Sequence, residues 1–475
     1  MARKTTGRKR RTNAAVAGDQ GSISKIGPST RYDFRGRGLT PYGGLLPVAT
    51  MLEKLGFREL VEGRITVGRH TVAMNLYQFV LSILLGLYIG LERLNHLRYI
   101  AQDPIVNGIL GVARLPVQST FWRFLQHMQI FNVGQWKKIN LEMRKRVWQA
   151  SNVRLKEVVI DTDTTVETVY GHQQGAHKGF NPKNRGKRCF EPILSFIAEM
   201  REYVAGRLRS SNHLTGEEIQ KHLREVFNSL PDSVEKVTNR MDAGFYCWDT
   251  VEVHEEARHG FIIVATKHAP ILRLLETAAW KPGGGWDGWT EFEYQPGGWP
   301  RPCRFIAVRR IDEKAEEEKD RQPQLFEEPS YIYRVFVTNL PGSVLKLVDF
   351  YDERASTENL IKEAKNDAGL GAVPSKMFVA NQNFFQWVMI AYNLNCWLGL
   401  FERSNEREYQ HTTLAIQRLR FLFIAAKIWS HANRGGIHYS DQYPEKGLFE
   451  RLMGRLRSIR AGPRGFAPVV AQAWT

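Results

Sequence analysis

The spacing of apolar residues predicts helices toward both ends of the chain. From about residue 45 to 150, apolar side chains recur every three or four positions, as on helices with one buried face. The run 71–91 has no charged residue, but polar residues and two glycines interrupt it, so we expect a buried helix rather than a membrane span. Residues 378–400 are apolar almost all round and contain several asparagines and glutamines, which predicts a second buried helix.

The middle of the chain has the pattern of strands. Residues 156–166 form an apolar run that continues into alternation, and 234–246 form a second such segment, with a helical pattern at 213–230 between them. Further strand candidates follow at 259–269, 290–295, 303–311 and 331–340, and the helical pattern returns from about residue 350. This order predicts a mixed α/β core that is interrupted by a β insertion and flanked by helices.

The charge of the chain narrows its possible partners. There are 66 Lys and Arg residues against 49 Asp and Glu, which gives a net charge of +17 and favours a polyanion or an anionic surface as partner. Four cysteines without a CxxC pair argue against a disulfide scaffold or a zinc ribbon and favour a reducing compartment. The first residues are charged rather than apolar, so we expect no signal peptide, a cytoplasmic location and no membrane partner.

Three segments are candidates for contact with a nucleic-acid backbone or groove. The first eleven residues hold six basic residues, and the run Arg451–Arg464 holds five arginines and no acid; solvated surface is the simpler alternative for both. Around Pro116, a turn is followed by the start of a helix, which fits either a helix-turn-helix or a capped helix in an all-helical domain. The candidate contacts are Arg8, Lys9, Arg10, Arg11, Gln118, Ser119, Thr120, Arg123, Arg455 and Arg457.

These changes of pattern divide the chain into six expected parts. They are a disordered basic arm (1–30), a helical DNA-binding domain (31–150), the first part of the α/β core (151–255), the β insertion (256–342), the second part of the core (343–400), and a helical C-terminal region for DNA binding or dimerisation (401–475).

The segment 350–367 carries a carboxylate between two cations. If it is drawn as one helix, Arg354, Glu358 and Lys365 share an arc of roughly 40°. The side chains of Leu360, Ile361, Ala364 and Ala368 then form the side that faces the core. Such a pattern can be an ordinary Arg–Glu pair that stabilises the helix. It can also be a carboxylate that holds a divalent cation while the two cations bind phosphate oxygens.

Three further acids favour the second interpretation. Asp161 and Asp163 lie two apart on a predicted strand and therefore on the same face, and Asp242 follows another short strand just before the turn expected at Gly244. Carboxylate oxygens from separate strands and one helix suit Mg²⁺ or Mn²⁺ at a site that also binds phosphate. A pair of such ions can activate a water or a 3′-hydroxyl and stabilise the leaving oxygen.

The arrangement Tyr351-x2-Arg354-x3-Glu358-x6-Lys365 resembles the Y-(2)-R-(3)-E-(6)-K signature of the IS4-like DDE transposases of bacterial insertion sequences. The chain looks most like their IS1380 branch, and the resemblance runs from about residue 35 to 460. Further matching segments are Asp161–Thr165, Val169–Ala176, Gly179–Lys183, Arg240–Phe245 and Lys365–Asp367.

The resemblance implies an RNase H-like core whose catalytic and metal-binding acids are Asp163, Asp242 and Glu358, with two Mg²⁺ or Mn²⁺ ions. Asp161 is the alternative first ligand, although the family's first acid precedes a small residue and a threonine, as Asp163 does. The resemblance also implies that Tyr351, Arg354 and Lys365 contact phosphates near the cleaved DNA end. The strands between Asp242 and Glu358 correspond to the β insertion of such enzymes.

Two other features of the chain are candidate DNA contacts. The insertion holds Trp280, Trp286, Trp289 and Trp299, and insertions of similar transposases stack an aromatic ring on a flipped base; we include Trp299, although packing is the simpler role for each tryptophan. His172 follows the first acid-bearing strand and could reach the scissile phosphate, or it could be a structural histidine.

The function that the resemblance implies is DNA transposition. The protein would bind the terminal inverted repeats of an insertion sequence, cleave the ends and transfer the 3′-hydroxyl strands to target DNA by a cut-and-paste route. Synapsis of two ends implies that the protein acts as a homodimer on double-stranded DNA. The expected location is the cytoplasm of a bacterium, at the nucleoid. The alternatives are an RNase H-like nuclease or resolvase without strand transfer, and a non-catalytic DNA-binding protein derived from a transposase.

Overall fold

The computed structural model describes residues 26–68, 73–179, 181–211, 213–313, 330–404, 409, 411–431 and 434–460. The contacts divide the chain into the units Met1–Gly38 and Leu39–Thr475, and every helix and strand below belongs to the second unit. Arg8, Lys9, Arg10 and Arg11 of the expected basic arm lie outside the described residues.

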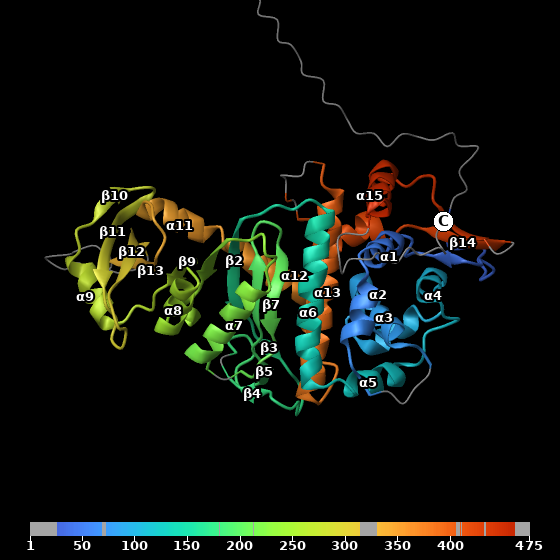
Figure 1. The fold of residues 1–475 in the computed structure, drawn as a ribbon, viewed down its shortest axis with the longest axis horizontal. Coiled ribbons are helices and arrows are strands. Elements are labelled where there is room, and N and C mark those ends of the chain that lie inside the picture. Colours follow the sequence, from blue (N-terminus) through green and yellow to red (C-terminus); the bar gives the residue numbers. More distant parts are fainter. Residues whose placement is uncertain are drawn as a thin grey trace, which may run out of the picture. The chain divides into compact units, whose positions relative to one another are not determined.

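The largest sheet of the fold is mixed and has nine strands, several of which are labelled in Figure 1. In order across the sheet, its strands are β10 (Lys281–Gly283), β11 (Trp286–Tyr294), β12 (Cys303–Ile311), β13 (Tyr331–Thr338), β9 (Gly260–Val264), β8 (Lys236–Met241), β2 (Glu157–Thr164), β6 (Ile193–Ile197) and β7 (Glu202–Arg207). Strand β8 is parallel to both β2 and β9, and the other neighbouring pairs are antiparallel. The predicted mixed α/β core is confirmed.

The β insertion is not a separate sheet. Strand β13 pairs with β9 through Phe336↔Val264 and its neighbours, so β10–β13 extend the central sheet. The segment 259–269, which we expected inside the insertion, forms β9, which pairs in parallel with β8 and is almost entirely buried. Its continuous apolar run is typical of a strand that is covered on both faces.

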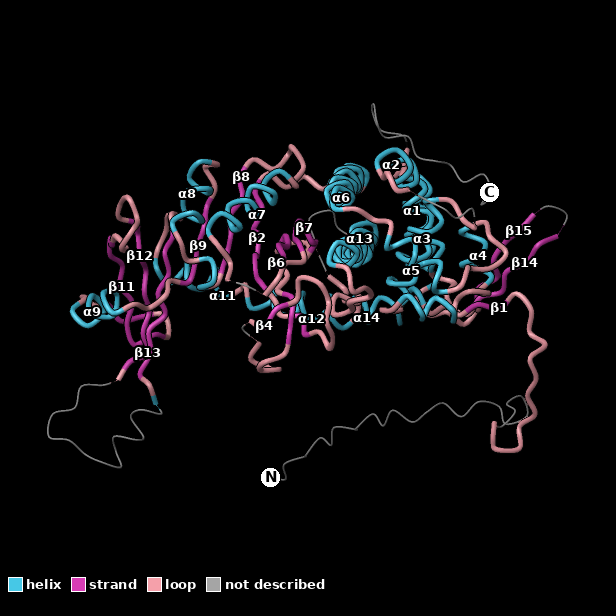
Figure 2. Tube along the Cα trace, turned by 90° about the horizontal axis from the view of Figure 1, so that it is seen from below, coloured by secondary structure: helices cyan, strands magenta, loops and turns pink. Residues whose placement is uncertain are grey.

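The helical region before the sheet packs against a long buried helix from the second half of the chain. It comprises α1 (Leu45–Lys54), α2 (Phe57–Arg64), α3 (Leu76–Ile89), η1 (Leu94–Tyr99), α4 (Pro104–Leu110), α5 (Gln118–Gln126) and α6 (Ile130–Ala150). Helix α13 (Phe378–Glu402) lies side by side with α6 (Figure 2) and also packs on α3 and β7. Both predicted apolar helices, α3 and α13, are buried, as expected. None of the helices in the described part of the chain has the length and apolar character that a membrane span requires.

A buried ion pair fastens these helices to the sheet. Arg144 of α6 lies 2.7 Å from Glu202 of β7, and both side chains are fully buried. The indole nitrogens of Trp148 and Trp397 donate to the same carboxylate at 3.0 and 2.8 Å. Because each charged group is fully hydrogen-bonded, the pair is tolerated in the core and joins α6, α13 and the edge of the sheet.

The region after α13 corrects the prediction of a purely helical C-terminal part. It holds α14 (Leu414–Gln417), η3 (Arg418–Leu422), the hairpin β14 (Ala426–His431) and β15 (Arg434–Tyr439), and α15 (Lys446–Ser458). Strand β14 also pairs with β1 (Leu39–Thr40), which makes a three-stranded sheet from opposite ends of the chain. A pairing partner this distant in sequence is not visible in the local pattern of the hairpin.

The remaining helices cover the central sheet and the insertion. They are α7 (Gly216–Asn228), η2 (Ala243–Phe245), α8 (Trp248–Glu256), α9 (Ala269–Thr277), α11 (Val344–Asp352) and α12 (Ala355–Asn366). A small separate sheet of β3 (Glu167–Thr168), β5 (Arg188–Phe190) and β4 (His177–Lys178) follows directly after β2.

Candidate active site

Asp163 and Asp242 lie at the carboxyl ends of two neighbouring parallel strands. The last registered pair between β2 and β8 is Thr162↔Met241, and each aspartate is the next residue along its strand. Since neighbouring strands lie about 4.8 Å apart, this register brings the two aspartates to the same edge of the sheet. The Asp242 Oδ1 accepts a hydrogen bond of 3.0 Å from the amide of Gly244, which forms the turn expected there.

Glu358 approaches the site from the first turn of α12. The segment 350–367 is not one helix, as the sequence suggested, because α11 ends at Asp352 and α12 begins at Ala355. The predicted core side is confirmed, since the side chains of Leu360, Ile361 and Ala364 in α12, and of Ala368 just after it, are buried. Glu358 itself is exposed, so the helix points this carboxylate away from the core.

The three carboxylates share one electrostatic environment. Burial raises the pKa of Asp163 to about 6; the charge of Arg354 opposes this shift, and the charges of Asp242 and Glu358 add to it. All three side chains are carboxylates, and carboxylate oxygens are the ligands that Mg²⁺ and Mn²⁺ prefer. As the side chains stand, no group of three or more His, Cys, Asp or Glu residues in the described ranges is gathered closely enough to hold a metal ion.

Arg354 binds directly to Asp163. Its Nη2 lies 3.0 Å from the Asp163 Oδ2 and donates to the carbonyl of Thr162 at 3.1 Å. The guanidinium is buried at the break between α11 and α12. It therefore supplies the positive charge that partly offsets the desolvation of Asp163.

Asp161 has a different partner, although it lies on the same strand face. Both of its carboxylate oxygens are bound by Arg240 of β8, at 2.6 Å from Nε and 2.9 Å from Nη2. Both side chains are almost completely buried. The remaining Arg240 nitrogen, Nη1, donates to the carbonyl of Phe350 at 2.7 Å and to Glu353 at 3.1 Å. Sequence reasoning missed this role of Arg240, although the residue lies two positions before Asp242 and so shares its strand face.

Lys365 and Tyr351 have contacts within the protein. The Lys365 Nζ donates to the carbonyl of Val166 at 2.8 Å and lies 3.0 Å from Glu167. Tyr351 is buried near the end of α11, with its ring 4.8 Å from that of Phe336, and burial raises its pKa to about 12. The structure thus places Tyr351 on α11, Arg354 at the break between the helices, and Glu358 and Lys365 on α12.

The helix-turn-helix candidate is exposed on α5. Gln118, Ser119 and Arg123 are exposed and Thr120 is partly exposed, whereas Phe121, Phe124 and Leu125 face the core. His172 is exposed in the turn after β3.

Two other predicted DNA contacts are engaged in packing or capping. Trp299 is buried against the rings of Tyr246, Trp248 and Phe305, so that little of its own ring is open to a base. Arg455 donates to the carbonyls of Phe401 and Arg403 near the end of α13, while Arg457 is exposed on α15.

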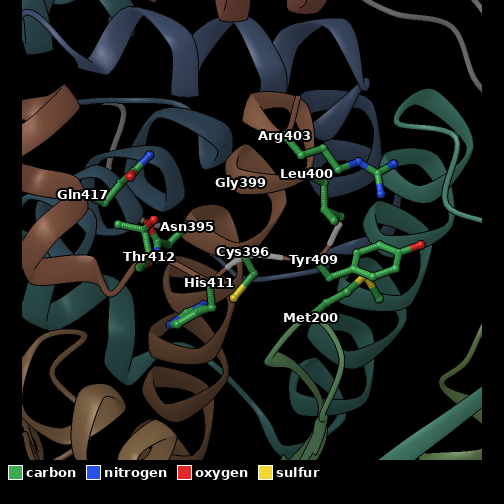
Figure 3. A pocket seen from close by; sticks show the side chains of 10 residues that line it. All are labelled: Met200, Asn395, Cys396, Gly399, Leu400, Arg403, Tyr409, His411, Thr412 and Gln417. Carbon is green, nitrogen blue, oxygen red and sulfur yellow. Dashed lines mark hydrogen bonds between the residues drawn. The ribbon is translucent and has the colours of Figure 1, made fainter. Parts of the chain in front are cut away.

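A small pocket between α13 and the segment that follows it does not belong to this site (Figure 3). Its volume of about 10 Å³ has room for no more than one water molecule. One of its walls is His411, whose Nε2 lies 2.8 Å from Glu363 of α12, and Glu363 also accepts a hydrogen bond of 2.8 Å from the Leu414 amide. These contacts hold α12 against the C-terminal region.

Comparison with known proteins identifies the family. Residues 24–461 match the model of the family described as Transposase DDE domain group 1. The chain belongs to this family. It is therefore a DNA transposase of the DDE type, an enzyme that cleaves DNA.

Similar solved structures are distant. A piggyBac transposase synaptic complex with hairpin DNA is 11% identical, with 90% of this chain and 85% of that chain covered and a TM-score of 0.41. A pre-cleavage Mos1 transpososome is 10% identical, with 34% and 54% covered and a TM-score of 0.17. No curated protein matches the chain.

Proposed function

We propose that this transposase cuts DNA at the ends of its own insertion sequence with Asp163, Asp242 and Glu358 as its catalytic acids. The observation that carries the proposal is the register of β2 and β8, which puts the two aspartates at one edge of the sheet. Glu358 comes from a third element, and its charge raises the pKa of Asp163. Three carboxylates from three elements at one sheet edge suit the binding of divalent cations beside a phosphate.

The sheet supports an RNase H-like core. Strands β7, β6, β2, β8 and β9 are neighbours in that order, with the first three antiparallel and the last two parallel to β2. This is the order expected of an RNase H-like sheet, and it puts the acids of β2 and β8 beside each other at its centre.

Asp163, Asp242 and Glu358 would hold Mg²⁺ or Mn²⁺, two ions per site. When bound, these ions supply the positive charge that activates a water or a 3′-hydroxyl and stabilises the leaving oxygen. Asp163 rather than Asp161 is the first ligand in this proposal, because the oxygens of Asp161 are already occupied by Arg240 in the core.

Arg354 and Lys365 would bind phosphates of the cleaved end. Each cation contacts an acid in the free protein, Arg354 with Asp163 and Lys365 with Glu167. A DNA phosphate would compete for these cations, so DNA binding would release the Asp163 carboxylate for a metal ion. The ring of Tyr351 packs on Phe336 and lies 6.0 Å from the Arg354 guanidinium, so Tyr351 would contribute mainly by positioning Arg354.

Recognition of the terminal repeats would come from other parts of the chain. The exposed residues of α5 can face a DNA groove, and the basic arm and Arg457 can contact the backbone. Trp299 and His172 remain candidates for contact with the end itself. The proposal also includes a homodimer that pairs two DNA ends and transfers the strands by a cut-and-paste route. We place this activity at the nucleoid of a bacterium.

The test is cleavage of a duplex that carries the terminal inverted repeat, in the presence of Mg²⁺. We expect Asp163→Ala, Asp242→Ala and Glu358→Ala each to reduce cleavage by at least about 100-fold. The matched control is Glu276→Ala, which removes an exposed acid from α9 and should cleave like the wild type. Retained cleavage in the Asp242 or Glu358 variant would overturn the site assignment. Cleavage without joining to a plasmid would favour the nuclease alternative, and binding without cleavage would favour the non-catalytic one.

A further inference from the structure

We propose that the small sheet β3–β5–β4, together with the loop that joins β4 to β5, is a docking surface for the phosphate backbone of double-stranded DNA beside the active site. The surface consists of Lys178, Lys183, Arg185, Lys187 and Arg188. The inference rests on the proposed function, because it concerns the DNA duplex that passes the catalytic acids.

The charged residues of this segment are all positive. Residues 168–190 contain five Lys and Arg residues and no Asp or Glu. All five cations are exposed. None of them forms an ion pair with a carboxylate of the described residues, whereas the buried cations Arg144, Arg240 and Arg354 are all paired. The surface therefore presents positive charge that the protein itself does not neutralise.

The cations are carried on a segment that is fixed to the body of the fold. Strand β5 pairs with β3 through Thr168↔Cys189 and with β4 through Lys178↔Arg188. The ring of Phe190 stacks on Phe378 of α13 at 5.5 Å. Before β4, the backbone amide of Gln174 donates to the carbonyl of Lys376 at 2.9 Å, and in β4 the carbonyl of His177 accepts from the Ser211 hydroxyl at 2.7 Å. The backbone of these strands is thus fixed before DNA binds, so that its ordering adds little to the entropy cost of binding.

The surface is close to the proposed catalytic acids. Strand β3 begins four residues after Asp163, and Lys365 of α12 binds both Val166 and Glu167 at this connection. From Asp163 to Thr168, five residues of chain span at most about 17 Å. The loop that carries the cations returns to this point, because the side-chain amide of Asn184, between Lys183 and Arg185, donates to the Thr168 hydroxyl at 3.2 Å. A duplex whose phosphate lies at the acids would thus pass the cations within one helical turn, about 34 Å.

Duplex DNA fits this surface better than a protein partner does. The five side chains are long cations on an exposed, polar segment, and phosphates are the groups that such cations bind irrespective of base sequence. We therefore expect contacts that position the DNA and do not read its sequence. Such contacts release counterions, which makes their number measurable.

The experiment measures binding of the full chain to two 30-base-pair duplexes, one with the terminal repeat and one of random sequence, as a function of NaCl concentration. EDTA is present, so that no cleavage occurs. The test variant is Lys183→Gln/Arg185→Gln/Lys187→Gln. Its matched control is Lys138→Gln/Lys221→Gln/Arg273→Gln, which removes the same charge from exposed positions on α6, α7 and α9.

We expect the slope of log K against log[NaCl] to become less steep by about 2 to 3 in the test variant on both duplexes, since each lost phosphate contact removes about 0.9. The control should keep the wild-type slope. A test variant with the slope of the control would overturn the proposal, as would a change confined to the duplex with the repeat. If the triple variant does not fold, Lys187→Gln alone should lower the slope by about 1. Failure of the wild type to cleave in Mg²⁺ would overturn the proposed function instead, and leave this binding result standing.

Discussion

Arg240 binds both oxygens of Asp161, at 2.6 and 2.9 Å, across the two parallel strands that carry the proposed catalytic aspartates. Each partner lies two residues before one of these aspartates on its own strand. With its remaining nitrogen, Arg240 also binds the carbonyl of Phe350 and the carboxylate of Glu353, near the start of the helix that carries Glu358. One guanidinium thus connects β2 and β8 to the end of α11 and to Glu353, just before the helix that carries Glu358.

Breaking this pair should destabilise the protein. Asp161→Asn removes the only buried counter-charge that contacts the guanidinium, since Glu353 is exposed, and we expect the free energy of unfolding to fall by about 3–5 kcal/mol in urea denaturation. The control is Glu235→Gln, which removes an exposed ion pair with Lys156 and should leave the free energy of unfolding close to that of the wild type. An Asp161→Asn variant as stable as this control would show that the pair does not hold the strands together.

The Arg144–Glu202 pair should matter in the same way for the helices. Arg144→Met leaves the Glu202 carboxylate buried with only two indole donors, and a loss of about 3–5 kcal/mol is expected in the same assay. The neighbouring Lys145 forms an exposed pair with Asp232, so Lys145→Met should change stability by less than about 1 kcal/mol. Equal effects of the two substitutions would contradict the role given to the buried pair.

The stability of the fold should fall as the pH rises from about 4.5 to 7. Burial raises the pKa of Glu402 to about 7, while Gln417 and Arg420 lower it and Glu445 raises it. In this pH window the folded protein keeps a proton on Glu402 that the unfolded chain has lost, so raising the pH favours unfolding. Above the folded pKa, the penalty is constant at up to about 3 kcal/mol.

The variant Glu402→Gln keeps a polar partner for Gln417 and removes the titration. Thermal unfolding from pH 4.5 to 8 should therefore give a variant that gains stability over the wild type as the pH rises. If the difference between the two proteins does not change with pH, Glu402 is not protonated in the folded state.

The sequence predicts the parts of this fold in which local pattern and burial agree. Strand β2 stands out because its apolar run ends in acids, and α3 and α13 stand out because most of their positions are apolar. Strands β6 and β7 were not predicted. They are short, and β7 carries Glu202 and Arg207, whose charges are accommodated only through partners on α6 and α7.

The site was predictable in its residues but not in its internal pairing. Residue spacing on a strand places Asp161 and Asp163 on one face, but it does not show which of them is held by an arginine. That distinction depends on the parallel register Asp161↔Arg240, a contact between residues that are 79 apart in the chain. The break between α11 and α12 was not predictable either, because neither Gly nor Pro occurs at Glu353 and Arg354. The contacts of Arg354 with Asp163 and Thr162, which are distant in sequence, hold the chain in this conformation.

Glu358 offers the most direct test of the proposed catalytic site. Its side chain is exposed, so Glu358→Gln should leave the unfolding temperature within about 1 °C of the wild type. The measurement is Mg²⁺-dependent cleavage of a duplex that carries the element's terminal repeat, by wild type and Glu358→Gln at equal concentration. The account predicts a loss of at least about 100-fold in the cleavage rate of the folded variant. Cleavage at the wild-type rate would contradict it.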